Sequence, residues 1–167
     1  PLAIYWSPAL DFACLPNLIL GSVFHFGYQY YLVESYKKGD LSQVYPIARA
    51  SAPLIVTLIS LLILDVNLGV SELIGVALIA SGLVATSGLH SKKVPSAAVK
   101  SALITGCFIA AYSLTDGYGG RIGGSPVAFY GWLAIINGFV WLVYILLVSP
   151  TSIPKMFGSA KWVFLGG

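Results

Sequence analysis

The chain has 167 residues, of which 57% are hydrophobic and only 9% are charged, and its mean hydropathy is +0.87. Ordinary soluble domains carry about 25% charged residues, so this composition lacks the polar surface that a globule in water needs. The net charge of +3 is too small for a nucleic-acid surface, and we expect no nucleic-acid partner. Several apolar runs reach the roughly 20 residues that cross a bilayer core, which predicts an all-α, polytopic transmembrane helix bundle.

The first half of the chain predicts two long helices. The first covers about residues 10–36, with Ser7 as its N-cap and Pro8 in its first turn. The second covers about residues 41–64 and is opened by the short turn GDLS. Both segments are bounded by polar residues, so we expect each of them to cross the membrane once.

Three more helices follow. The third spans about residues 71–89, with Ser71 as its cap and Glu72 at the positive end of the helix dipole. The fourth covers about 96–116 and is followed by GYGGRIGGSP, which we interpret as a glycine-rich connection. The fifth covers about 126–148. Alternating strand patterns are absent from the sequence, which makes a β-barrel a poor description of it.

The two ends of the sequence predict a fragment. It begins with PLAIYW, without Met, and ends in KWVFLGG, where a further apolar helix is expected to start near Trp162. No signal peptide with a basic region and a small-residue cleavage site is present. Membrane insertion is therefore expected to depend on the spans themselves.

Charged residues in the loops predict an orientation. In the five-span arrangement all lysines fall on one side of the membrane, and the opposite loops carry Arg121, Asp65 and Glu72. By the positive-inside rule, the lysine side is cytoplasmic. The lysines are Lys37, Lys38, Lys92, Lys93, Lys100, Lys155 and Lys161.

Arg49 is the residue that such an apolar chain is least expected to carry, since it stands between Pro46 and Pro53 in the second predicted helix. It lies roughly 12 Å along that helix at 1.5 Å per residue. A charge at that depth costs at least about 2.5 kcal/mol and has to face the bundle interior or water. Arg49 either bonds carbonyl groups freed by the prolines or lines a substrate cavity beside Ser42 and Tyr45, which share its helix face. Discontinuous helices of this kind are typical of transporter sites.

Other predicted helices also carry polar or aromatic residues at helical spacing. A histidine or asparagine within a membrane either forms interhelical hydrogen bonds or binds a ligand, and tyrosines and tryptophans also serve as interfacial anchors. The residues are Ser22, His25, Gln29 and Tyr36 on the first helix, Thr105, Tyr112 and Asp116 on the fourth, and Tyr130, Asn137, Trp141 and Tyr144 on the fifth.

Asp116 stands at the predicted end of the fourth helix, just before Gly117. It either caps that turn with its side chain or, as a buried acid, pairs with Arg49 or carries a coupling proton. On the third helix a stripe of small residues favours close helix packing or a dimer face. This stripe consists of Ala77, Ser81 and Ala85.

Signatures of enzymes and metal sites are sparse. Cys14 and Cys107 lie in apolar sequence without a CxxC pattern, so we expect packing cysteines rather than a disulfide or a metal site. HExxH, GxSxG and Walker A motifs are missing, and GYGGRIGG has no preceding strand as a phosphate loop requires. We expect no enzyme and no cofactor, with an intramembrane serine hydrolase that uses His25 as a formal alternative.

Three blocks together resemble the EamA-type branch of the drug/metabolite transporter superfamily: YKKGDLSQVYPIARASAPLIV, LGVSELIGVALIASGLV and ALITGCFIAAYSLTDGYGGRIGGSPVAFYGWL. The resemblance covers nearly the whole chain and implies a ten-helix carrier made of two five-helix inverted repeats. Residues 1–95 would be the last three helices of the first repeat, and 96–167 the first, incomplete part of the second. The chain departs from the family pattern at two places. Ala50 stands where the family block usually has glycine, and in LDVNLGVSE a valine follows LG, where the family often has glutamate.

We therefore expect a multi-pass secondary transporter of the bacterial inner membrane that moves a small polar metabolite by alternating access, with export implied by the resemblance. Its partners would be the substrate, the lipid bilayer, a coupling proton or ion and a second copy of the chain. A non-transporting packing or assembly subunit is the alternative, and a channel is disfavoured because no filter-like sequence is visible. The candidate substrate-binding residues are Arg49, Tyr45, His25, Tyr112, Asp116, Tyr130 and Asn137.

Overall fold

The computed structural model describes residues 9–86 and 95–150, and every regular element within them is a helix. The predicted all-α class is confirmed for these ranges, whereas the expectations at Ser7, Pro8 and Trp162 concern residues outside them. The elements are η1 (Phe12–Cys14), α2 (Leu15–Tyr36), α3 (Leu41–Leu62), α4 (Val70–Thr86), α5 (Ser96–Ile122) and α6 (Pro126–Val148).

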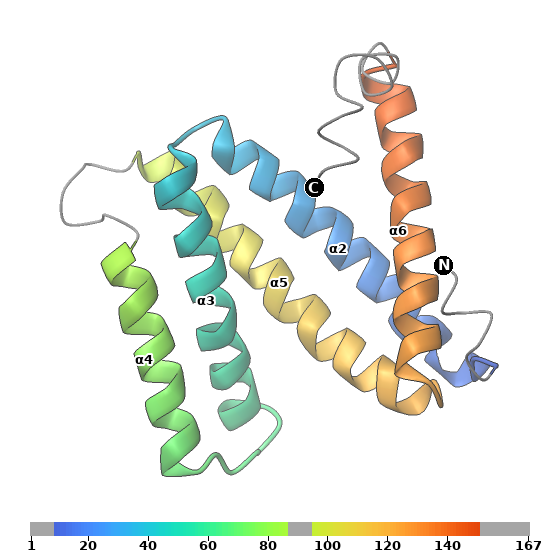
Figure 1. Cartoon of the computed structure of the whole chain (residues 1–167), viewed down its shortest axis with the longest axis horizontal. Coiled ribbons are helices and arrows are strands. Elements are labelled where there is room, and N and C mark those ends of the chain that lie inside the picture. The colour runs from blue at the N-terminus through green and yellow to red at the C-terminus, as the bar shows by residue number, and fades with distance from the viewer. Residues whose placement is uncertain (1–8, 87–94, 151–167) are drawn as a thin grey trace.

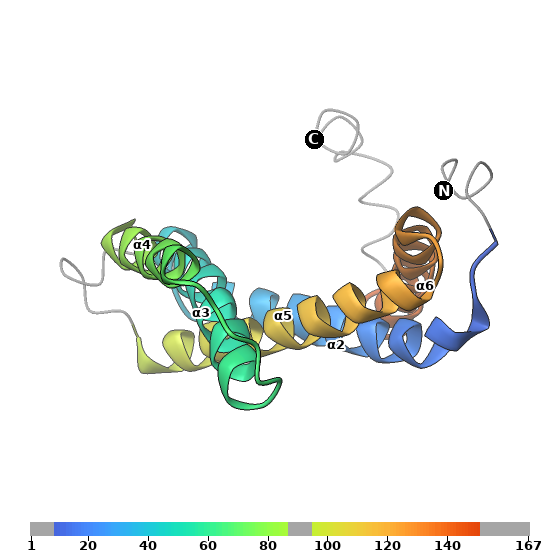
Figure 2. The same ribbon diagram turned by 90° about the horizontal axis from the view of Figure 1, so that it is seen from below.

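The centre of the molecule is an antiparallel pair formed by α2 and α5, which lie side by side along most of their length (Figure 1). The helices α3 and α4 form a hairpin at one end of this pair, and α6 stands at the other end (Figure 2). At the α3 end, Lys38 Nζ donates a hydrogen bond of 3.2 Å to Ser101 Oγ. The described lysines Lys37, Lys38 and Lys100 therefore lie at one end of the central pair.

Within residues 9–86 and 95–150, three helices, α3, α5 and α6, are long and apolar enough to cross a membrane. This finding supports a membrane protein but gives fewer spans than the five expected from sequence. The helix α4 has a shorter apolar stretch, Val70–Gly82. The helix α2 is as long as α3, but His25, Gln29 and a series of tyrosines lower its hydropathy.

Helix starts follow local hydrogen bonding. Asp40 caps α3 by accepting the Ser42 N–H at 2.9 Å, and Ser125 caps α6 through the Ala128 N–H at 3.3 Å. The prediction that Ser71 caps the third helix is wrong, since α4 already begins at Val70. Instead the Glu72 carboxylate accepts the Gly69 N–H at 2.6 Å.

The first helix also begins later than predicted. Asp11 accepts the Ala13 N–H at 2.9 Å and caps the 3-10 turn η1. The α-helix then begins at Leu15, with Pro16 in its first turn, where the missing N–H of proline costs no helix hydrogen bond.

The glycine-rich segment after Asp116 is not a connection, because α5 continues through it to Ile122. Packing outweighs the poor helix propensity of glycine here. A Cβ on Gly119 would lie 2.5 Å from the ring of Phe129 and 2.7 Å from the Cβ of Asn17, so only glycine allows α5 to approach α2 and α6 this closely. The turn comes later, at Gly124, with φ +73°.

Two separate apolar clusters hold the helices together. The first joins α3 to the start of α5 through Val44, Ile47, Ala48, Ala98 and Ala102. The second joins the start of α2 to α6 through Cys14, Leu18, Phe129 and Leu133. The middle of the central pair lies between them, and there the sequence places its polar residues.

The structure can be compared with the expectations for the two cysteines and for the small residues on α4. Cys14 is fully buried, as expected of a packing cysteine, and burial raises the pKa of its thiol. Cys107, by contrast, is exposed on α5, so it is not a packing residue within the described chain. The stripe on α4 is exposed as well, and its members Ala77, Ser81 and Ala85 do not face α3.

Candidate functional site

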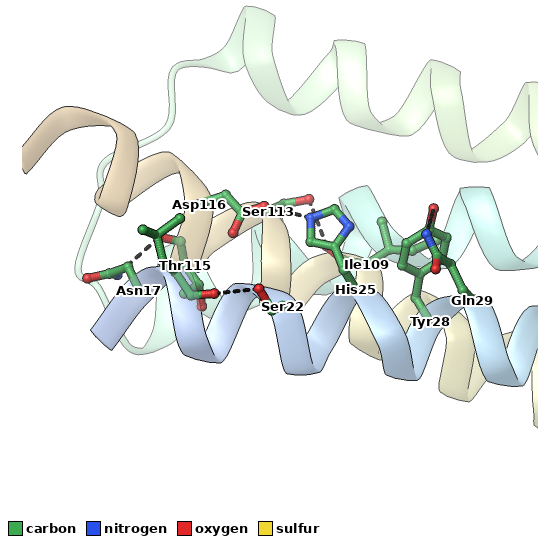
Figure 3. A network of polar contacts seen from close by, with 10 residues as sticks. Asn17, Ser22, His25, Tyr28, Gln29, Ile109, Ser113, Thr115 and Asp116 are labelled. Carbon is green, nitrogen blue, oxygen red and sulfur yellow. Dashed lines mark hydrogen bonds and ion pairs between the residues drawn. The ribbon is translucent and has the colours of Figure 1, made fainter. Parts of the chain in front are cut away.

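A buried pair of titratable side chains joins α2 to α5. His25 Nε2 lies 2.8 Å from Asp116 Oδ2, and the side chains are 18% and 3% exposed. Figure 3 shows the two residues pointing toward one another across the helix interface. An ionised carboxylate only accepts hydrogen bonds, so with an ionised Asp116 the proton of this contact is on Nε2.

The position of Asp116 corrects the capping hypothesis. It lies well inside α5, which ends at Ile122, and its partner is His25 rather than Arg49. The reason is the close packing of α5 on α2, which brings together residues 91 positions apart in sequence. Near the same place, Asn17 Nδ2 donates to the Thr115 carbonyl at 3.1 Å (Figure 3), which fixes the register of the two helices.

Gly21 forms the floor beneath Asp116. A Cβ added there would collide with Asp116 Oδ1 and would lie 3.3 Å from a methyl group of Leu133. Within the described part of the chain, Oδ1 is buried and has no hydrogen-bond partner. Among the described hydrogen bonds, the one that holds this carboxylate is the contact with His25.

Two tyrosines enclose the imidazole of His25. The ring of Tyr112 stacks on it at 4.0 Å between centroids, and Tyr28 meets its edge at 5.6 Å. The two tyrosine rings also touch each other, at 5.2 Å. We call His25, Asp116, Tyr28 and Tyr112 the His25 cluster.

Arg49 lies on α3 and points outward from the apolar contacts of that helix. Its Nε donates to the Tyr45 hydroxyl at 3.1 Å, and the guanidinium lies 5.3 Å from the centre of that ring. No carbonyl beside Pro46 or Pro53 is bonded to Arg49 among the described contacts, and α3 remains one helix through both prolines.

The positive charge of Arg49 also acts on the His25 cluster. The guanidinium interacts electrostatically with the hydroxyls of Tyr28 and Tyr112. Tyr112 in turn is within the electrostatic influence of both Arg49 and Asp116.

A pocket of about 410 Å³ adjoins Tyr45 where α2 ends and α3 begins. Its size is within the range of small-molecule sites, and its walls are mostly apolar. The lining residues are Tyr36, Leu41, Ser42, Tyr45 and Pro46. Ser42 and Tyr45, which the helix period placed on one face with Arg49, thus share a pocket wall.

The two candidates on α6 lie away from the His25 cluster. Tyr130 is half exposed and meets the ring of Phe129 edge-on. Asn137 is partly buried, and its Oδ1 has no hydrogen-bond partner in the described ranges, nor does the neighbouring Trp141 Nε1. Trp141 instead packs on Phe26 at 5.2 Å and on Tyr144 at 5.3 Å.

Other polar side chains of the predicted stripes satisfy their own helices. Ser22 Oγ donates to the Leu18 carbonyl at 2.7 Å, and Thr105 Oγ1 donates to the Ser101 carbonyl at 2.9 Å. Such bonds use the one hydrogen that each hydroxyl can donate. No group of three or more metal-binding side chains gathers within residues 9–86 and 95–150.

Two members of the site were missed by sequence reasoning. Tyr28 follows His25 by three residues and so shares its helix face, which is a signal that the sequence does contain. Gly21 carried no such signal, because its role depends on the helix that packs against it.

The chain matches no protein-family model, and neither curated proteins nor solved structures give a match.

Proposed function

We propose that the protein is a secondary transporter that moves a small polar metabolite with an anionic group across the bacterial inner membrane by alternating access. The three apolar helices and the buried polar pair between α2 and α5 support this proposal. We further propose that the chain is part of an EamA-type carrier of ten helices in two inverted repeats, divided at residue 95, and that it works as an exporter. The sequence blocks quoted above support that part.

The observation that carries the proposal is the state of Arg49. It lies on a helix that is long and apolar enough to cross a membrane, and within the described residues no carboxylate lies within ion-pair distance of it. Its one side-chain hydrogen bond there goes to the neutral hydroxyl of Tyr45. A charge at membrane depth normally has a partner, and an anionic substrate would be that partner.

The planar guanidinium suits a carboxylate, because two of its N–H groups can donate to the two oxygens at once. Nε is already used by Tyr45, so the terminal nitrogens are the groups that would bind. Tyr45 thereby orients the guanidinium beside the pocket. In this proposal the substrate enters from the Tyr45 pocket and lies toward Tyr112.

The alternative function is a packing or assembly subunit that transports nothing. The unpartnered polar atoms of Asn137 and Trp141 favour this reading, since they could bond a neighbouring helix. In that case Arg49 would also serve assembly, and its replacement would reduce folded protein and activity together.

Variants of Arg49 in the full-length protein test the proposal. Uptake of labelled amino acids and carboxylic acids would be measured in proteoliposomes. Arg49→Gln is expected to abolish saturable flux, and Arg49→Lys to weaken apparent affinity by about 1.5–3 kcal/mol, roughly tenfold or more, because the bidentate geometry is lost. Expression and detergent stability should stay close to the wild type.

Arg121→Gln is the matched control, because it removes the same charge from an exposed position in the last turn of α5. It should leave flux unchanged. Normal flux in both Arg49 variants, or a loss of flux that parallels a loss of folded protein, would refute a substrate-binding role for Arg49.

A further inference from the structure

An open, mostly apolar groove of about 530 Å³ runs along the first half of α5. Within the described part of the chain, the residues that line it all belong to this helix. They recur three and four positions apart, which places them on one face of α5, opposite the buried residues Ala98, Ala102 and Thr105. We call this feature the α5 groove, and it is lined by Ser96, Val99, Lys100, Leu103, Ile104 and Cys107.

The α5 groove is about as long as one membrane leaflet is thick. The helix is long and apolar enough to cross a membrane, and it rises about 16 Å from Ser96 to Cys107 at 1.5 Å per residue. This rise is about half of a hydrocarbon core of roughly 30 Å. Leu103, in the middle of the groove, is 46% exposed, so an acyl chain can lie against it.

Lys100 gives the groove a charged end. It stands near the start of α5 and is exposed, and within residues 9–86 and 95–150 it forms no ion pair. Helical side chains tilt toward the N-terminus of their helix. The Lys100 ammonium therefore reaches toward the membrane surface, while its carbon chain covers apolar surface in the groove. A cation thus stands where the groove meets the headgroup layer.

The other charges at this end do not neutralise Lys100. Lys38 bonds Ser101 at 3.2 Å, which brings the lysines of α2 to the start of α5. Glu34 is shared by these two lysines, at 2.6 Å and 3.7 Å, and Asp40 caps α3. The described charged residues at this end are Lys37, Lys38, Lys100, Glu34 and Asp40. Positive charge is in excess here, and among the described ion pairs Lys100 has no counterion.

We propose that the α5 groove binds one anionic phospholipid, with the headgroup phosphate on Lys100 and one acyl chain along the apolar wall. An ammonium and a phosphate form a strong, charge-assisted hydrogen bond, and basic sites at the membrane surface recognise anionic headgroups. A zwitterionic lipid brings no net charge to neutralise Lys100, so it should bind less tightly. This lipid site does not depend on the proposed transport.

A second copy of the chain fits the α5 groove less well. Copies in one membrane share one orientation, so a twofold axis along the membrane normal would bring two grooves together at equal depth. The two Lys100 ammonium groups would then face each other, and like charges repel more strongly in apolar surroundings than in water. Charge therefore favours an anionic lipid over a dimer contact at this face.

Photoactivatable lipids test the site on the full-length protein in phosphatidylcholine bilayers. Two probes carry the same diazirine in the middle of one acyl chain, one with a phosphatidylglycerol and one with a phosphatidylcholine headgroup, and mass spectrometry locates the cross-links. The phosphatidylglycerol probe is expected to label Leu103, Ile104 and Cys107 about fivefold more than the other probe. Equal labelling by both probes, or labelling that avoids the α5 groove, would overturn the proposal.

Variants of Lys100 identify the residue that selects the headgroup. Lys100→Gln should reduce labelling by the phosphatidylglycerol probe about fivefold, to the level of the other probe, whereas Lys100→Arg keeps the charge and should retain the labelling. Lys37→Gln is the matched control, because it removes a lysine from the same end of the molecule but outside the groove. Equal losses in Lys100→Gln and Lys37→Gln would show general attraction to the membrane surface and no lipid site.

Oxidative cross-linking tests the second copy as an occupant. Cys107 is exposed in the groove, whereas Cys14 is buried, so a dimer contact at this face would place two Cys107 thiols near each other. No disulfide-linked dimer that depends on Cys107 is expected in phosphatidylglycerol bilayers. If such a dimer forms, is absent from Cys107→Ser and suppresses lipid labelling, the α5 groove is an interface between copies and the lipid site is refuted.

Discussion

Two charged sites in this molecule are built in opposite ways. The His25–Asp116 pair is closed in by Gly21 and two aromatic rings, and each side chain has the other as its partner. Arg49 is exposed, and its side-chain hydrogen bond within the described residues goes to the hydroxyl of Tyr45. The first site pairs its two titratable side chains with each other, whereas the second leaves a charge available.

This difference distinguishes a pair whose loss should reduce stability from a cation whose loss should reduce binding. Removing one member of a buried pair leaves an uncompensated charge and destabilises the fold. Removing an exposed cation leaves nothing unsatisfied, so its loss should affect binding more than stability. The two sites can therefore be told apart by measuring stability and flux on the same variants.

The largest difference is expected between His25→Phe and Arg49→Met. Phenylalanine keeps a ring against Tyr112 but leaves Asp116 without a partner, which should cost about 3 kcal/mol of unfolding free energy. Arg49→Met should cost about 1 kcal/mol or less. Reversible unfolding of the full-length protein in mixed micelles provides the measurement.

A second substitution serves as the control for the histidine variant. Asp116→Asn added to His25→Phe removes the buried charge and should restore part of the lost stability. If His25→Phe proves no more destabilising than Arg49→Met, the buried pair does not differ from the exposed arginine as we describe.

Two glycines sharpen the same comparison at the level of packing. Gly21→Ala places a methyl group against Asp116 Oδ1 and should cost about 1–3 kcal/mol through overpacking. Gly117→Ala on α5 meets nothing within 4 Å and should stabilise the helix by about 0.5–1 kcal/mol. Thermal unfolding in detergent compares them, and a loss of stability in both variants would show that Gly117 is also packed.

The smallest effect is expected at the exposed end of α2. A hydrogen bond of 2.6 Å from Lys37 lowers the pKa of Glu34. A lowered carboxyl pKa contributes stability above the ordinary Glu value, and this contribution disappears as the pH falls through the lowered pKa. In the wild type, the melting temperature should therefore fall slightly as the pH is lowered through the pKa of Glu34, and Glu34→Gln should remove this decrease. If the variant shows the same dependence of melting temperature on pH as the wild type, the ion pair of Glu34 with Lys37 does not contribute to stability.

Helices with clear starts and ends were predictable. The turn GDLS and Pro126 mark the starts of α3 and α6, and the structure has both where the sequence predicts them. The end of α5 was predicted wrongly, because glycines are read as helix breakers when their neighbours are unknown. Gly119 is helical because of Phe129 and Asn17, and the sequence does not reveal that these residues meet there.

The candidate site was predictable as a set of residues but not as a set of contacts. Tyr45 and Arg49 are one turn apart on one helix, so their contact follows from the helix period. His25 and Asp116 are on different helices, and their meeting depends on the register of α2 on α5. That register is set by close contacts at Gly21, Gly27 and Gly119, which have no periodic signal.

The low hydropathy of α2 has a consequence for how the chain enters a membrane. The helix is polar at its middle, yet it lies along α5, which is apolar enough to cross, and Lys38 bonds Ser101 at their shared end. Its histidine pairs with Asp116, which is on α5. Because α2 precedes α5 in the chain, it is synthesised before the helix that carries its polar partners, so the burial of its polar side chains depends on the completion of α5.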